Sequence, residues 1–489
     1  PSGNGMAMYD RERNRLVPFL DKNRHYAWTA ENTLIDLFVD RQDNVWFCGK
    51  YTGLQKATFS AMQFNTLSHT APTESGHDIR GIFQDSKGRI WLGAKSGVVS
   101  VYDSGLHFIG NLGADGTLSP HSTSQVGHAY AFAEDRNGTI WIATKFSGLI
   151  RLLPNGEKSF RLTRYTADGS PYGLPHNDIF SICIDRHNRL WGATFGGGIF
   201  YADLRAKHLR FIHPGNRLKT YPIQTFKRTR FITADRSGDI WVCTTSGLIR
   251  FKDNFHSPSD IRFVVYKRQP DNASSLSYND VLEAYFTKAD SMYVCTYGGG
   301  FCKVERMEGD SLRFTPFTTA NGLRSDVIFS VQEDKGGNLW FASENGFVRY
   351  SPRKNSVENF SSRFFGKQID INEGMSLRLK NGVLAYPSRN YTLVYFNPER
   401  IKASKFVPKI ILTRLFVDQT EQQPSADDDA ILESDINCTE CIMLPSDKNG
   451  FNLEFAALDY RDPTNVSYAY MMKGIDAGWN MIGNRHNAI

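Results

Sequence analysis

One phrase recurs along most of this 489-residue chain, and each copy places a tryptophan or tyrosine a few residues behind a turn. Clear copies read GRIWLGAKSGVV, GTIWIATKFSGLI, NRLWGATFGGGIF and GNLWFASENGFVRY. The aromatic anchors of the eight copies are Trp46, Trp91, Trp141, Trp191, Trp241, Tyr293, Trp340 and Tyr386. Successive anchors lie 45 to 52 residues apart. A repeat of this length is typical of propeller blades and kelch-like arrays.

Each repeat is consistent with four antiparallel strands. An aspartate six residues before most anchors predicts a tight turn, because its side chain bonds nearby backbone; these are Asp40, Asp85, Asp135, Asp185, Asp235 and Asp334. The anchor strand follows, then a glycine-containing turn, a third strand such as GLIRF, and a more variable fourth strand such as RFVVYKR. The pattern predicts an all-β propeller of seven or eight four-stranded blades. The main rival, an open β-solenoid, usually has shorter repeats.

The sequence at the two ends of the chain does not fit a single ring of blades. Residues 1–405 carry the repeats, but eight anchors plus the opening GMAMYDRERNRL exceed seven blades, so the first ~60 residues are candidates for an upstream propeller. Residues 406–489 lack the phrase and contain alternating stretches such as FNLEFAALDY. An immunoglobulin-like sandwich needs about seven strands. We therefore expect the truncated start of an Ig-like β-sandwich module.

Composition narrows the classes of function. The 57 Lys and Arg and 51 Asp and Glu are scattered along the chain, whereas nucleic-acid binders concentrate basic residues, so we expect no direct contact with nucleic acid. The seven cysteines have irregular spacing and predict no disulfide framework. Cys438 and Cys441 form a lone CxxC without the further ligands of a zinc site. We expect neither a metal ion nor another cofactor.

The repeated phrase resembles the regulator-propeller repeat of bacterial two-component sensors. The tail FNLEFAALDYRDPTNVSYAYMMKGIDAGW resembles the start of the triple-tyrosine module that follows those propellers, and the matching residues are Tyr460, Tyr468, Tyr470, Gly474 and Trp479. The resemblance implies a fragment of the periplasmic sensor region of a hybrid two-component system. Such propellers sense oligosaccharides from polysaccharide breakdown, and the signal passes through the module to a cytoplasmic histidine kinase. It also implies a membrane-anchored parent, which we expect to be a homodimer, with no catalysis in this region.

Two sets of loops are predicted to share one face of the ring. They are the turns that follow the anchor strands, named here anchor turns, and the loops that lead into each blade, named here entry loops. These loops vary between repeats, and variable loops on a rigid scaffold usually carry binding. Aromatic rings can cover the apolar face of a sugar, while amides and charged groups pair its hydroxyls. The predicted ligand-binding residues are Lys50, Tyr51, Lys145, Phe146, His176, Asn177, Phe195, Tyr278, Asn279, Tyr297, Arg324 and Glu344.

Two other functions remain compatible with the sequence. A propeller-fold polysaccharide lyase or glycoside hydrolase would need central carboxylates at a suitable separation. The entry loops supply Asp78, Asp178, Asp280 and Asp326, although their repetition at equivalent positions favours a role in turns. A protein-interaction scaffold is the third hypothesis. For each candidate loop residue, the alternative to ligand contact is solvation or turn closure.

Overall fold

The computed structural model describes residues 7–11, 13–18, 34–51, 53–58, 64–68, 78–361, 369–389, 393–401, 407–427, 430–448, 450–460, 463, 466–483 and 485–488. The chain forms two compact units. One unit is Met62–Lys402, and the other combines Pro1–Ala61 with Ala403–Ile489. Strands dominate both units, as the sequence predicts.

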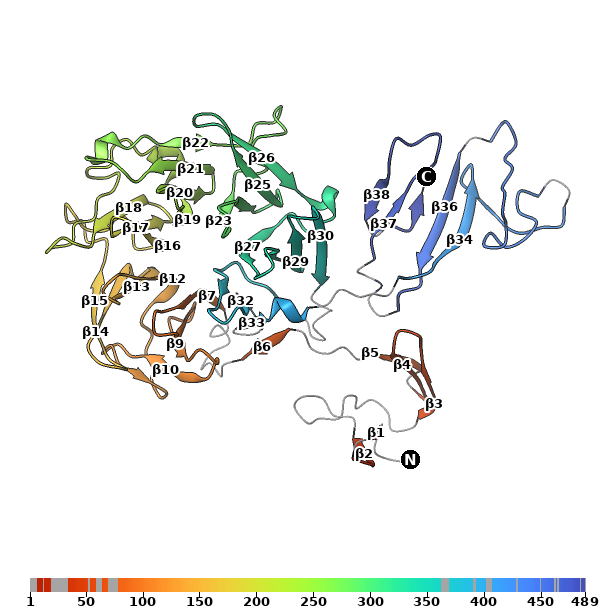
Figure 1. Ribbon diagram of the computed structural model, residues 1–489, viewed down its shortest axis with the longest axis horizontal. Helices are drawn as coiled ribbons and strands as arrows, with labels where there is room; N and C mark the ends of the chain where they lie inside the picture. The colour runs from red at the N-terminus through yellow and green to blue at the C-terminus, as the bar shows by residue number, and fades with distance from the viewer. Residues whose placement is uncertain are drawn as a thin grey trace. The chain divides into compact units, whose positions relative to one another are not determined.

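The unit Met62–Lys402 is a closed β-propeller of seven sheets (Figure 1). The innermost strands of consecutive sheets contact one another, and the innermost strand of the last sheet contacts that of the first. Of the seven or eight blades predicted, the ring therefore contains seven, numbered here in chain order.

The strands of each blade are antiparallel, and in blades 1 to 6 they follow chain order from the axis outward. Blades 1 and 2 consist of β7 (Ile79–Gln84), β8 (Ile90–Ala94), β9 (Val99–Tyr102), β10 (Phe108–Leu112) and the short β11 (Leu118–Ser119), then β12 (His128–Glu134), β13 (Ile140–Lys145), β14 (Leu149–Pro154) and β15 (Phe160–Tyr165). Blades 3 and 4 consist of β16 (Ile179–Ile184), β17 (Arg189–Thr194) and β18 (Gly198–Asp203), then β19 (Thr229–Ala234), β20 (Asp239–Thr244), β21 (Gly247–Lys252) and β22 (Val264–Tyr266). Blades 5 and 6 consist of β23 (Val281–Phe286), β24 (Met292–Thr296), β25 (Phe301–Arg306) and β26 (Leu312–Phe317), then β27 (Ile328–Glu333), β28 (Leu339–Ser343), β29 (Gly346–Ser351) and β30 (Ser356–Ser361). Blade 7 consists of β31 (Leu377–Arg378), β32 (Leu384–Pro387), β33 (Leu393–Phe396) and β6 (Asn65–Leu67). Short helices lie in the connections: α1 (Ile223–Phe226), η2 (Pro258–Asp260), η3 (Thr319–Asn321) and η5 (Pro398–Arg400).

The ring is closed by a strand from its own start. β6 precedes blade 1 in the chain but pairs with β33 of blade 7, with Leu67 opposite Leu393 and Asn65 opposite Tyr395. The neighbouring Phe64 is buried and packs against Phe396, with ring centroids 4.6 Å apart. The first and last parts of the ring are thereby joined in one sheet.

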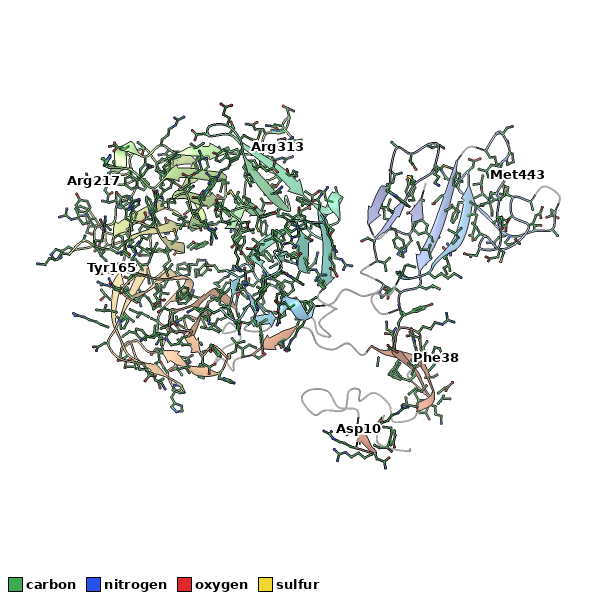
Figure 2. All side chains as sticks on the ribbon, viewed as in Figure 1. Asp10, Phe38, Tyr165, Arg217, Arg313 and Met443 are labelled. Carbon is green, nitrogen blue, oxygen red and sulfur yellow. The ribbon has the colours of Figure 1, made fainter. Side chains whose placement is uncertain are left out.

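The repeated phrase explains how each blade holds its shape. Asp185 Oδ2 accepts a hydrogen bond from Trp191 Nε1 at 2.9 Å, and Asp185 Oδ1 accepts one from the backbone N–H of Arg189 at 2.9 Å. The aspartate thus fixes the turn and supplies the acceptor that a buried indole N–H needs. The same two bonds occur at Asp85, Asp135, Asp235 and Asp334. The ring's five anchor tryptophans are 0–1% exposed and belong to hydrophobic clusters. Side chains crowd the space between the strands of the ring (Figure 2).

The other unit contains several smaller sheets. Its first part holds the hairpin β1 (Ala7–Asp10) and β2 (Arg15–Pro18) and the sheet β3 (Leu34–Val39), β4 (Asn44–Gly49) and β5 (Gly53–Thr58). Its second part holds the sheet β35 (Thr420–Gln422), β34 (Ile410–Val417), β36 (Phe451–Ala457) and β39 (Asn487–Ala488), and the pair β37 (Tyr468–Tyr470) and β38 (Asn480–Gly483). The β3–β5 sheet keeps the blade signature, because Asp40 Oδ2 accepts from Trp46 Nε1 at 2.8 Å. The assignment of the first ~60 residues to an upstream propeller stays a prediction. The assignment of residues 406–489 to an Ig-like module also stays a prediction.

No helix among the described residues has the length and apolar character needed to cross a bilayer.

Candidate functional site

One position of the repeat surrounds the axis of the ring. The residue eleven places before each anchor lies on or beside the innermost strand of its blade, and the seven residues are Arg80, Tyr130, Phe180, Arg230, Leu282, Phe329 and Met375. All seven line one cavity of about 440 Å³, named here the mouth. Binding sites for small ligands range from about 300 to 1,000 Å³. The mouth is therefore large enough to hold part of an oligosaccharide.

Two further positions of the repeat contribute to the mouth. The position two places before the axial residue supplies Asp178 in blade 3 and Glu373 in blade 7. The anchor turns supply Lys145, Phe146 and Phe195. Entry loops and anchor turns lie on one face, as predicted, since Phe195 N donates to Asp178 O and Gly196 N donates to Lys227 O, each at 2.9 Å.

A stack of aromatic rings forms one wall of the mouth. Tyr130 stacks on Phe180 with centroids 4.8 Å apart, and Phe180 stacks on Phe195 at 4.9 Å. Guanidinium groups cover the two ends, with Arg80 Cζ 5.7 Å from the Tyr130 centroid and Arg228 Cζ 5.5 Å from that of Phe195. Because the ring faces are occupied by one another and by these cations, the stack offers mainly ring edges as an apolar wall.

Phe146 is the aromatic residue of the mouth that keeps most of its surface free. Its side chain is 61% exposed, with Lys145 Nζ 4.8 Å from its centroid and the His128 ring at 5.6 Å. Its φ is +71°, in the left-handed region that disfavours residues with a bulky side chain. Blades 3 and 5 place glycines at this position, Gly196 and Gly298, also with positive φ. A residue in such a sparsely populated backbone conformation is of the kind that clusters at active sites and ligand clamps.

Charged side chains cross the mouth in a connected network. Arg230 makes a two-pronged pair with Asp280, from Nε at 2.6 Å and Nη2 at 2.9 Å. Its Nη1 reaches Glu373 Oε1 at 2.6 Å. Arg80 Nη1 approaches Glu373 Oε2 at 3.3 Å and also donates to the Glu373 carbonyl. Glu373 therefore joins the arginines of blades 1 and 4, and paired guanidinium–carboxylate contacts of this kind are strong and directional.

A buried acid also lines this cavity. Burial raises the pKa of Glu283 to about 8, and the hydrogen bond from the Val331 N–H lowers it by less. At neutral pH this carboxyl is mostly protonated and can donate a hydrogen bond. Ser330 Oγ, on the same cavity wall, is buried with no hydrogen-bond partner among the described residues. Both groups can pair a ligand hydroxyl.

The entry-loop residues predicted from the sequence have hydrogen bonds that hold the loops. Asn177 Oδ1 accepts from Ala167 N and Asn279 Oδ1 accepts from Arg268 N, each at 2.8 Å. His176 Nδ1 accepts from Asp178 N at 3.0 Å. His176 and Tyr278 also pack over Gly196 and Gly298, where a Cβ would lie 2.8 Å and 3.4 Å from their rings. These contacts support turn closure for this group.

The remaining predicted residues lie apart from the cavity wall. Tyr297 is half exposed in the anchor turn of blade 5, and Glu344 accepts from Ser325 Oγ at 2.8 Å. The Arg324 carbonyl receives a long contact, 3.5 Å, from Asn345 Nδ2. Lys50 and Tyr51 belong to the other compact unit, where Lys50 Nζ lies 5.1 Å from the Tyr51 centroid. Of the predicted set, Lys145, Phe146 and Phe195 share the mouth.

Sequence reasoning missed Arg80, Tyr130, Phe180 and Glu373. The first three lie in or beside short apolar runs that predict a buried strand, so a role at the surface of a cavity was not evident. The available signal was their common spacing from the anchors, at a position that alternates between arginine, aromatic and aliphatic residues.

Two other cavities of similar volume lie elsewhere on the ring. One of about 390 Å³ is lined by residues that include Arg250, Phe255 and Asp310, and another of about 400 Å³ by residues that include Tyr285 and Arg378. Neither contains a predicted ligand-binding residue. Within the described ranges, no group of three or more His, Cys, Asp or Glu side chains is arranged to hold a metal ion.

Comparison with known proteins agrees with the repeat and the fold. The two-component regulator propeller family matches residues 73–96, 124–146, 173–196 and 322–345. These segments join entry loops to anchor turns in blades 1, 2, 3 and 6. The prediction of regulator-propeller repeats is confirmed.

The chain is also similar to longer proteins. It is 26% identical over 299 residues to histidine kinase P4 from Formosa agariphila, covering 60% of this chain and 21% of that protein. Its fold resembles the extracellular domain of BT3049, assigned to the hybrid two-component systems of B. thetaiotaomicron, with a TM-score of 0.63, 20% identity, and coverage of 99% of this chain and 60% of that one. The extracellular domain of BT4673, assigned to a one-component system of the same organism, has a TM-score of 0.52 and 19% identity, with coverage of 99% of this chain and 62% of that one. This chain therefore spans about a fifth of the matched kinase and three fifths of these extracellular domains.

Proposed function

We propose that this chain is the extracytoplasmic sensing region of a two-component receptor and that the mouth of its propeller binds an oligosaccharide. The repeats, the kinase relative and the two extracellular domains of similar fold support the sensor role. Fold alone does not define function, so the ligand has to be argued from the site.

The observation that carries the proposal is the strained and exposed Phe146 at the edge of the mouth. Its ring offers an apolar surface for the C–H face of a sugar, and Lys145 and Asp178 lie beside it on the cavity wall. On the same cavity wall, the protonated Glu283 and Ser330 Oγ, which has no hydrogen-bond partner among the described residues, can bond hydroxyl groups. An apolar platform with a few convergent polar groups is typical of a specific small-ligand site.

The carboxylates that would suit a glycoside hydrolase or lyase have structural partners instead. Asp78 pairs with Lys95, Asp178 accepts from the Phe146 N–H at 2.8 Å, and Asp280 pairs with Arg230. Asp326 accepts from Thr319 N at 2.7 Å. These contacts favour binding without catalysis.

Signal transfer is the second part of the proposal. A sensor responds only if its ligand binds two states of the receptor with different affinity. We propose that binding at the mouth changes the relation between propeller and triple-tyrosine module, or between two chains of a dimer, and that the parent protein passes this change to a cytoplasmic histidine kinase.

Calorimetric titration against a panel of neutral and acidic oligosaccharides tests the binding claim. We expect saturable binding by one sugar class without release of shorter products. Phe195→Ala should weaken it, whereas Tyr297→Ala should not, because Tyr297 takes the same place in its anchor turn but lies outside the cavity wall. Turnover of a bound sugar would instead identify an enzyme, and silence across the panel would reject the proposal.

A further inference from the structure

One carboxylate in the mouth lies between two arginine side chains. Glu373 lies between two guanidinium groups that come from blades 1 and 4, with Arg230 Nη1 at 2.6 Å and Arg80 Nη1 at 3.3 Å from its two oxygens. Two guanidinium groups that converge on both oxygens of a single carboxylate form a specific receptor for that group. In this structure the receptor is filled by the chain itself.

Two nearby cationic side chains are incompletely paired among the described residues. Arg80 Nε is buried and has no hydrogen-bond acceptor among the described residues. Lys145 makes no ion pair with a carboxylate of the described ranges. A buried donor without an acceptor is costly, so a ligand that supplies one gains affinity.

The balance of charge shows how an anion could enter. Arg80, Lys145 and Arg230 line the mouth together with Asp178 and Glu373, and Asp280 pairs with Arg230 from outside the wall. With Glu283 mostly protonated, three cations meet three carboxylates. A ligand carboxylate that takes the place of one of these three carboxylates leaves the balance unchanged. Glu373 suits this role, because its side chain is 35% exposed and can turn to water.

We propose that the ligand of the mouth is an acidic oligosaccharide, whose carboxylate replaces that of Glu373 between Arg80 and Arg230. This inference rests on the proposed function. It defines the substrate class as uronic-acid oligosaccharides and makes Glu373 an internal competitor.

The test compares uronate oligosaccharides of pectin and alginate type with their carboxyl-reduced counterparts by calorimetry. The wild-type chain should bind the best uronate at least about tenfold tighter than its reduced form, as expected for a lost charge-assisted contact. Glu373→Gln should raise the affinity for that uronate several-fold, because the competitor is gone. Glu344→Gln removes the same charge from the anchor turn of blade 6, outside the cavity wall, and should leave the affinity unchanged.

The outcomes separate this inference from the proposed function. If the reduced sugars bind as tightly as the uronates or tighter, and Phe146→Gly abolishes that binding, the inference of an acidic ligand is wrong. The proposed sensor function would then still stand. If Glu373→Gln keeps the native melting temperature but binds the uronate no more tightly than the wild-type chain, the ligand carboxylate does not take the place of Glu373. Absence of binding by any sugar in the wild-type chain would reject the proposed function itself.

Discussion

At the scale of single residues, part of the candidate site could be predicted from the sequence. Lys145, Phe146 and Phe195 could be predicted because they follow an anchor strand, where loops carry binding. Tyr130 and Phe180 could not, because in the sequence they look like ordinary members of a buried strand. Their exposure to the mouth follows from the closing of the ring, which turns one residue per blade toward the axis.

Phe146 separates stability from binding. Phe146→Gly should keep or raise the melting temperature, because glycine adopts the positive φ at this position without strain. The same change should abolish oligosaccharide binding, since the apolar platform is removed. Differential scanning calorimetry and titration on one preparation measure both effects. A large loss of stability would show that the phenyl group of Phe146 stabilises the fold and does not serve mainly to contact a ligand.

Glu283 should make the stability of the propeller depend on pH. Its ordinary pKa of 4.5 is raised to about 8 in the folded state, so between these values the unfolded chain ionises while the folded chain keeps its proton. Stability should therefore fall with rising pH across this window, by at most about 1.4 kcal/mol per pH unit. Glu283→Gln should remove this loss, so that its advantage in urea unfolding grows from pH 4.5 to 8. If the stability advantage of Glu283→Gln does not change with pH, Glu283 is not protonated in the folded state across this window.

At the scale of elements, the blade could be predicted almost completely. The Asp-to-Trp spacing reports a real bond, such as that from Trp141 Nε1 to Asp135 Oδ2 at 3.2 Å, so each copy of the phrase marks a turn and its buried strand. The closing strand β6 could not be predicted, because three residues carry little pattern and their partner strand lies more than 300 residues away. Long-range pairing of this kind is set by topology, not by local sequence.

Loss of one turn aspartate should destabilise its blade. Asp135→Ala removes the acceptor of the Trp141 indole and of the Thr139 N–H, at a cost of roughly 2–4 kcal/mol in the free energy of unfolding. Asp168→Ala removes an exposed loop acceptor, that of Ser170 N, and should cost much less. Equal effects of the two changes in chemical denaturation would show that the indole bond adds nothing.

Closure of the ring should depend on Phe64. Its side chain is 4% exposed and packs against Phe347 and Phe396 of blades 6 and 7. Phe64→Ala should lower the free energy of unfolding by about 3–5 kcal/mol, the usual cost of emptying a buried phenylalanine site. Phe38→Ala, at an exposed position of the other unit, is the control. A change below about 1 kcal/mol would mean that β6 is dispensable, since surface substitutions have effects of that size.

At the scale of the whole molecule, the chain combines a rigid ring with a second unit. The ring is closed because the innermost strand of each blade contacts that of the next, and the last blade is completed by β6. A scaffold of this kind can hold seven variable residues around one cavity.

The account rests on the claim that the mouth of the propeller is the ligand-binding site. A crystal structure of this chain soaked with the tightest oligosaccharide of the panel tests it most directly. We predict sugar density in the mouth, in contact with Phe146 and the aromatic wall, and with a uronate in place of the Glu373 carboxylate. Sugar density on any other surface, with the mouth unchanged, would contradict the account.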